Sequence, residues 1–217
     1  MLKNIMVSGR TINKEVHYRM PITLSNTSGK GNFTLVNNTN KGNLAMSLSL
    51  SIQYSAGLFK TTYTGYFADN VSFFATATSA SIGGNPATSV QTTVISEPAT
   101  DDGSNFSVQW LGYFKPTTTQ TYTFFTNSDD ASYMWIGANA LSGFATANAT
   151  VSNGGTHPDQ ERSGSAALTA EIYYPIRIQF GESGGGDNFG FNYSTPTITK
   201  TTNVTGLVFY NPTTNGF

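Results

Sequence analysis

The sequence predicts an all-β protein built from antiparallel strands, arranged as a sandwich or a barrel. Composition is the first reason: charged residues make up 11% of the 217 residues and aromatic residues 13%. Disordered chains are usually charge-rich and aromatic-poor, so this chain is expected to fold. With so little charge, its polar surface must come from Thr, Ser, Asn and Gly, which favour strands and turns over helices.

The spacing of apolar side chains is the second reason. From residue 106 onward they recur at every second position, between turns rich in Gly, Asn, Ser and Pro, as in strands with one buried face. The sets expected to share a strand face are Val108, Trp110 and Phe114; Tyr122 and Phe124; Tyr133 and Trp135; Ile176, Ile178 and Phe180; and Phe189, Phe191 and Tyr193. We interpret Trp110 and Trp135 as core residues rather than as platforms for a sugar.

The chain divides at about residue 56. Residues 1–56 are expected to form a small β-rich extension, because Leu44, Met46, Leu48, Leu50 and Ile52 alternate with small or polar residues. Residues 57–217 carry the dense aromatic pattern and are expected to form the main domain. The extension is interpreted as a segment that anchors the chain to a partner.

Several functional classes are not expected. The net charge of −1 lacks the basic excess of nucleic-acid binders. Without cysteine there is no disulfide, thiolate zinc site or cysteine nucleophile. No stretch approaches the roughly 20 apolar residues of a membrane span. The N-terminus lacks the apolar stretch of a secretory signal, so we expect synthesis in a cytoplasm and no membrane partner.

Two neighbouring acids, Asp129 and Asp130, follow an aromatic strand. Adjacent carboxylates repel each other unless a cation lies between them. A cis peptide bond would place both on one side of the chain, whereas a trans bond in an extended strand would separate them. A hard cation such as Ca²⁺ would suit such a pair. The alternative is a solvated acidic turn.

A second acidic segment, residues 181–188, follows the strand that ends at Phe180. Its glycines allow backbone carbonyls to turn inward, and Glu182, Asp187 and Asn188 offer oxygen donors. The alternative is a mobile hairpin loop.

A series of motifs runs from Gly57 to about residue 200, at 57–59, 63–70, 106–116, 122–124, 128–130, 133–137 and 173–180. In their order and spacing they resemble the protective-antigen-type lectin module (the PA-14 domain), near its GLEYA and flocculin adhesin branch. The resemblance implies a two-sheet antiparallel β-sandwich for residues 57–217, with the N-terminal β extension outside it.

The resemblance also implies a calcium site that binds sugar hydroxyls directly. Asp129 and Asp130 then become carboxylate ligands. Glu182 stands where the adhesins have an asparagine ligand, and backbone carbonyls near Gly184 and Gly186 complete the shell. Glu for Asn adds a negative charge, which should tighten metal binding but could crowd a sugar. Glycine replaces the aromatic specificity residue of that loop.

Four residues beside this loop are expected to contact the ligand. Asp187 and Asn188 offer polar atoms, and Phe189 and Tyr193 are candidates for stacking on a sugar.

The strings at 127–133, 160–164 and 180–187 resemble virion proteins of tailed phages that infect marine cyanobacteria. That resemblance implies a non-enzymatic protein of the virion surface, present in many copies or as a homo-oligomer. Its N-terminal segment would dock onto other capsid or tail proteins, and its lectin-like domain would bind a cell-surface glycan.

Other functions stay open at this stage. The protein could be a purely structural decoration, cement, tail or neck component whose metal only stiffens loops, or an accessory module of a cell-surface adhesin. A glycosidase, which needs two carboxylates beside a cleft, is less well supported. Its candidates, Asp101, Asp102 and Glu161, lie in polar, turn-like contexts, and His157 is interpreted as an exposed loop residue.

Overall fold

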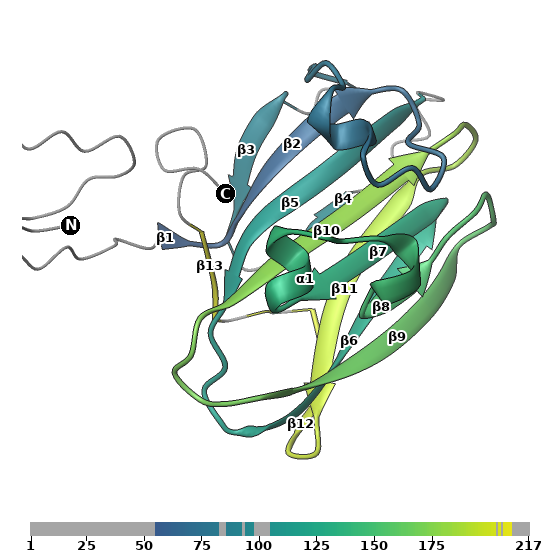
Figure 1. The fold of residues 1–217 in the computed structure, drawn as a ribbon. Coiled ribbons are helices and arrows are strands. Elements are labelled where there is room, and N and C mark those ends of the chain that lie inside the picture. The colour runs from purple at the N-terminus through teal and green to yellow at the C-terminus, as the bar shows by residue number, and fades with distance from the viewer. Residues whose placement is uncertain are drawn as a thin grey trace, which may run out of the picture.

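The computed structural model describes residues 55–82, 86–92, 94–97, 105–202, 204 and 206–209. The proposed N-terminal extension, except for its last two residues, lies outside this part, as do Asp101 and Asp102. The described residues form a β-sandwich of two antiparallel sheets (Figure 1), which confirms the predicted fold class.

Within the described residues the larger sheet has eight strands. Their order is β1-β13-β5-β10-β7-β8, with β2 paired to β5 and β3 paired to β2. The strands are β1 (Ser55–Ala56), β2 (Leu58–Thr64), β3 (Thr88–Gln91), β5 (Phe106–Phe114), β7 (Ala131–Ile136), β8 (Val151–Asn153), β10 (Tyr174–Glu182) and β13 (Leu207–Phe209).

The smaller sheet has five strands in the described part of the chain. Their order is β12-β11-β6-β9, with β4 paired to β11. The strands are β4 (Ser96–Glu97), β6 (Gln120–Asp129), β9 (Gln160–Leu168), β11 (Asn188–Thr195) and β12 (Ile198–Thr201).

The central core lies between the two sheets and follows the predicted alternation. Trp110 of the larger sheet stacks on Phe189 of the smaller one, with ring centroids 4.7 Å apart, and both are buried. The same core holds the predicted sets Val108, Trp110 and Phe114; Tyr122 and Phe124; Ile176, Ile178 and Phe180; and Phe189, Phe191 and Tyr193. The alternating aromatic residues of these sets therefore lie on the inner faces of the two sheets.

A second core, which we call the outer core, covers the other face of the larger sheet. Its buried residues are Phe67, Phe74, Ala131, Tyr133, Trp135 and Ala140. It lies under α1 (Ala138–Leu141), η1 (Phe73–Ala75) and the segment that joins β2 to η1. In Figure 1, α1 lies in front of β10. Trp135 is 0% exposed, which confirms that it is a core residue, and the core to which it belongs is the outer core.

Arg177 of β10 extends into the outer core. Its guanidinium donates a hydrogen bond to the Ala140 carbonyl at 2.9 Å. It also lies 4.1 Å from the centre of the ring of Phe144, a residue that precedes η2 (Thr146–Asn148). Burial lowers the pKa of Arg177 to about 10. The arginine therefore binds α1 to the sheet, which is a structural role.

A buried ion pair connects the two sheets. Lys60 of β2 and Glu97 of β4 are 2% and 1% exposed, and the ammonium group contacts the carboxylate directly. Since β2 belongs to the larger sheet and β4 to the smaller, the pair joins the layers inside the sandwich.

Two connections cross between the sheets at one end of the sandwich. β6 ends at Asp129 in the smaller sheet and β7 begins at Ala131 in the larger one, while the β10–β11 loop runs from Glu182 back to Asn188. Gly181 pairs with Ala131, and Asn188 pairs with Asp129, so the two crossings lie side by side. This end lies at the upper right of Figure 1. None of the helices in the described ranges is long and apolar enough to cross a membrane.

Candidate metal centre

Three carboxylates meet where the two connections cross. One oxygen each from Asp129, Asp130 and Glu182 lies within 4.8 Å of the others. The Asp129–Asp130 peptide bond is cis, the arrangement that places both carboxylates on one side of the chain, rather than the solvated acidic turn that the sequence also allowed. The structure therefore brings together the three side chains that the sequence suggested as metal ligands, although two of them lie in a segment far from the third.

The Asp130 carboxylate is held in one orientation by three hydrogen bonds. Oδ1 accepts from the backbone amide of His157 at 2.8 Å. Oδ2 accepts from the backbone amide and the hydroxyl of Ser183, at 3.0 and 2.8 Å. Donors of this kind orient a ligating carboxylate before the metal arrives. Two loops, 154–159 and 183–186, thus position Asp130.

Glu182 is fully buried, at 0% exposure. Its Oε1 accepts a hydrogen bond from the Gly184 amide at 2.6 Å, whereas Oε2 is buried and has no hydrogen-bond partner. Burial raises the pKa of Glu182 to about 7, and the negative charges of Asp130, Asp129 and Asp187 add to the rise. An uncompensated buried carboxylate oxygen is costly, so this oxygen indicates a ligand.

Asp129 is less buried than its neighbours. Burial and the charges of Asp130, Asp159 and Asp187 raise its pKa, while His157 acts in the opposite direction. The three acids therefore destabilise one another when all are ionised. The donor set consists of carboxylate oxygens only, which matches a hard divalent cation such as Ca²⁺ better than a soft one.

The loop at 183–186 borders the acid cluster and is exposed. Gly184 and Gly185 have φ angles of +146° and +112°, which favour glycine, and a Cβ at either would touch nothing within 4 Å. Gly184 and Gly186 thus lie beside the carboxylates, as expected, and ligation by their carbonyls stays a prediction. The loop presents no aromatic ring.

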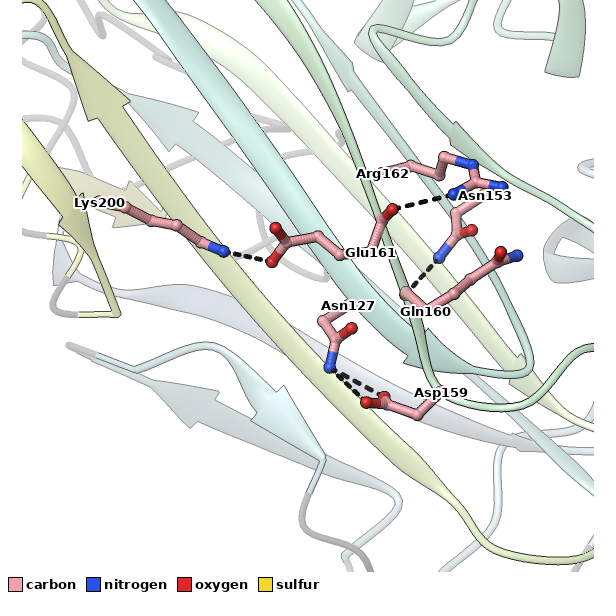
Figure 2. Close-up of polar contacts among 7 residues, drawn as sticks. All are labelled: Asn127, Asn153, Asp159, Gln160, Glu161, Arg162 and Lys200. Carbon is pink, nitrogen blue, oxygen red and sulfur yellow. Dashed lines mark hydrogen bonds and ion pairs between the residues drawn. The ribbon is translucent and has the colours of Figure 1, made fainter.

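An exposed carboxylate, Asp159, lies close enough to Asp129 for its charge to act on it. Figure 2 shows Asp159 with its partner Asn127. Asn127 Nδ2 donates to both of its oxygens at 2.8 and 3.0 Å, and Asn188 Nδ2 donates to Oδ1 at 2.7 Å. Asn188 is a predicted ligand contact. Its side chain is hydrogen-bonded to Asp159, and its backbone pairs with Asp129. Asp187, also predicted, is buried at 2% exposure and close enough to act on the charges of the cluster.

Two predicted ligand contacts are wrong. Phe189 is 1% exposed and stacks on Trp110, and Tyr193 is 6% exposed and packs against Phe114 and Tyr122. Both rings point into the central core, because β11 turns its aromatic face toward the larger sheet. Neither ring can stack on a sugar.

The groups considered for glycoside hydrolysis do not converge in the described part of the chain. Glu161 forms an ion pair with Lys200 on the face of the smaller sheet (Figure 2). The His157 ring nitrogen Nδ1 lies 3.0 Å from the Pro158 carbonyl oxygen. His157 contacts Asp130 through its backbone amide and not through its ring.

Sequence reasoning missed three neighbours of the cluster. Ser183 and the His157 amide hold Asp130, and the half-buried ring of Tyr66 lies close enough to Asp130 and Glu182 to feel their charges. Tyr66 belongs to the motif at 63–70 that carries the family resemblance, but that resemblance assigns no role to its ring.

Comparison with known proteins bears on the fold of this chain. The family model of the GLEYA domain matches residues 106–195, from β5 through β11. A search among curated proteins found no match to the sequence. The fold itself is that of the PA14-type β-sandwich, as solved structures show.

Three solved structures illustrate the likeness. The PA14 domain of the MpAFP antifreeze protein is 15% identical, with a TM-score of 0.53 over 76% of this chain and 96% of that one. The epithelial adhesin 9 A domain from Candida glabrata, in complex with Galβ1-4GlcNAc, is 18% identical, with a TM-score of 0.50 over 76% and 94%. An anti-sigma factor domain-containing protein from Clostridium clariflavum is 17% identical, with a TM-score of 0.53 over 73% and 48%. This chain thus spans about half the length of that protein, and the likeness to all three concerns the fold.

Proposed function

We propose that this chain is a non-enzymatic carbohydrate-binding module in which Asp129, Asp130 and Glu182 hold a calcium ion. The observation that carries the proposal is the buried, unpartnered Oε2 of Glu182 within a cluster of three carboxylates. A hard divalent cation would supply the missing positive charge and, when bound, a coordination position for sugar hydroxyls.

The chain's own groups prepare this site. Ser183 and the His157 amide hold Asp130 in place, and the Gly184 amide holds Glu182. Because these donors are already arranged, less ordering is needed when ligands bind. The loop at 183–186 beside the cluster is exposed and Asp129 is partly exposed, with Gly184 and Gly186 as proposed carbonyl ligands.

The fold supports sugar as the ligand class. A neighbour of the same fold, the epithelial adhesin 9 A domain, was solved with Galβ1-4GlcNAc bound. A single metal–sugar contact is weak, so attachment to a cell would depend on many copies of the module displayed together.

We further propose that the display surface is a virion, with residues 1–56 docking onto capsid or tail proteins. This rests on the phage-like strings at 127–133, 160–164 and 180–187 and on a cysteine-free, low-charge composition. A purely structural decoration protein, or a module of a cell-surface adhesin, are the other outcomes that binding experiments would reveal.

The test is binding of the purified chain to immobilised Galβ1-4GlcNAc and to a wider glycan array, in calcium and in EDTA. Glu182→Gln and Asp130→Asn should each lose at least about 100-fold in calcium affinity, because each removes a charged ligand of a divalent ion. The matched control is Glu171→Gln, an exposed acid paired with Lys115. Glycan binding that survives EDTA would overturn the calcium site. Calcium binding without any glycan signal would favour the structural alternative.

A further inference from the structure

The strongest unassigned feature is an aromatic ring on the outer face of the larger sheet, beside the acid cluster. Tyr66 follows β2, far from the cluster in sequence, and its ring is half-buried. In Figure 1 the blue segment after β2 reaches over the end of β10, where Glu182 lies. The inference below rests on the proposed function, since it concerns the same site.

Close packing on Gly181 fixes the position of this segment. A Cβ at Gly181 would lie 2.4 Å from Phe67 Cδ1 and 2.9 Å from Tyr66 Cδ2, so both rings occupy space that only glycine leaves open. Gly181 directly precedes Glu182. Tyr66 is therefore held on the outer face of the larger sheet at the end of β10, whereas the side chain of Glu182, the next residue, points to the opposite face of the strand.

Hydrogen bonds hold the backbone around Tyr66. The Ser107 hydroxyl donates to the Gly65 carbonyl at 2.8 Å and accepts from the Phe67 amide at 2.9 Å. Ser107 is fully buried and pairs with Gly181 across β5 and β10. The Tyr66 ring also packs edge-on against Phe67, with centroids 5.7 Å apart. The ring is thus preorganised by groups on both sides of it.

The charges of the cluster reach this ring. Burial raises the pKa of Tyr66 to about 12, and the nearby carboxylates of Asp69, Asp130 and Glu182 add to the rise. The phenol therefore keeps its proton at neutral pH. Packing on Gly181 and the hydrogen bonds of Gly65 and Phe67 thus hold the Tyr66 ring, and the charges of Asp130 and Glu182 act on it.

We propose that Tyr66 is a specificity-determining residue that packs its ring against the apolar C–H face of a pyranose held at the Asp129–Asp130–Glu182 site. Carbohydrate rings with several axial hydrogens on one face, such as galactose, present such a surface. Aromatic rings bind apolar surfaces of this kind at low entropic cost because they have only two rotatable bonds. Tyr66 thus supplies the aromatic contact that the loop at 183–186 lacks.

Binding of biotinylated Galβ1-4GlcNAc in saturating calcium tests the assignment. Tyr66→Ala should weaken sugar binding about tenfold, while Tyr66→Phe should stay within about threefold because it keeps the ring. Calcium affinity, measured by titration calorimetry without sugar, should not change in either variant. The control is Tyr173→Ala, an exposed tyrosine at the opposite end of β10.

A Tyr66→Trp variant provides a readout that a merely structural role would not move. Its emission should shift when sugar is added in calcium, whereas Trp110 and Trp135, both fully buried, should contribute no change. Sugar affinity of Tyr66→Ala equal to that of the parent chain would overturn the assignment of Tyr66 alone. Equal losses in Tyr66→Ala and Tyr66→Phe would also overturn it, in favour of the hydroxyl. Failure of the parent chain to bind any sugar would overturn both this inference and the proposed function.

Discussion

Two glutamates, Glu97 and Glu182, are almost equally buried but have opposite electrostatic surroundings. Glu97 lies between the sheets at 1% exposure, with the Lys60 ammonium against it. Glu182 lies at the end of the sandwich at 0% exposure, and the charges that act on it are those of Asp129, Asp130 and Asp187. The first acid has its counter-charge within the chain, whereas the second is placed among like charges.

The difference separates a structural ion pair from a binding site. The Lys60–Glu97 pair joins β2 to β4 within the interior. The Glu182 cluster instead lies at the end of the sandwich, where it borders the exposed loop at 183–186 and includes the partly exposed Asp129. A buried acid without an internal cation thus indicates where an external one belongs.

The largest expected effect comes from breaking the internal pair. Lys60→Met should lower the free energy of unfolding by about 3–5 kcal/mol, because Glu97 then stays buried without its counter-charge. Urea denaturation measures it. Lys115→Met, which removes an exposed partner of Glu171, should leave the midpoint almost unchanged. Lys60→Met combined with Glu97→Leu should recover much of the loss, and a single variant as stable as the parent would contradict this role of the pair.

Calcium should compensate the charge of Glu182 as Lys60 compensates that of Glu97. At a free concentration 100 times the dissociation constant, calcium should stabilise the fold by about 2.7 kcal/mol, seen as a higher Tm than in EDTA. Glu182→Gln should abolish most of that gain, while Glu171→Gln should retain it. Identical melting curves of the parent chain in calcium and in EDTA would sink the metal assignment.

The pH dependence of stability should differ with and without metal. The native chain holds a proton on Glu182 up to a pKa of about 7, whereas the unfolded chain loses it near 4.5. In EDTA, stability should therefore fall as pH rises from about 5 to 7. Calcium should remove or reverse this slope, because it binds the ionised carboxylate. Melting scans of the parent chain and of Glu182→Gln, which should lack this contribution, provide the comparison.

The smallest expected effect concerns the groups that orient Asp130. Ser183→Ala removes one of the two hydrogen bonds to Oδ2 and should weaken calcium binding about tenfold, with the metal-free Tm unchanged. Ser165→Ala is the control, since its hydroxyl bonds to Thr123 on the exposed sheet face. Calcium affinity equal to that of the parent would show that the backbone amides of Ser183 and His157 suffice to orient the carboxylate.

Sequence patterns predicted the strand faces well because alternation is a local property. Val108 and Trp110, or Ile176 and Ile178, share a face whatever the rest of the chain does. The same rule could not say what covers the opposite face. Tyr133 and Trp135 were grouped correctly, yet they lie in the outer core under α1 rather than between the sheets.

The errors at the site have a related cause. Phe189 and Tyr193 lie close in sequence to the loop at 183–186, but β11 directs both rings into the central core. Tyr66, far away in sequence, lies beside the cluster because Gly181 leaves room for it. Sequence proximity therefore selected the wrong aromatic rings.

The sequence by itself determined the strands, the aromatic core and the pairing of Asp129 with Asp130, because each depends on residues a few positions apart. Only the tertiary structure decided that Glu182 is buried beside them, since Asp130 and Ser183, 53 positions apart, meet through strand register. It also decided which acids have an internal counter-charge, because burial and neighbouring charge arise from distant segments packed together.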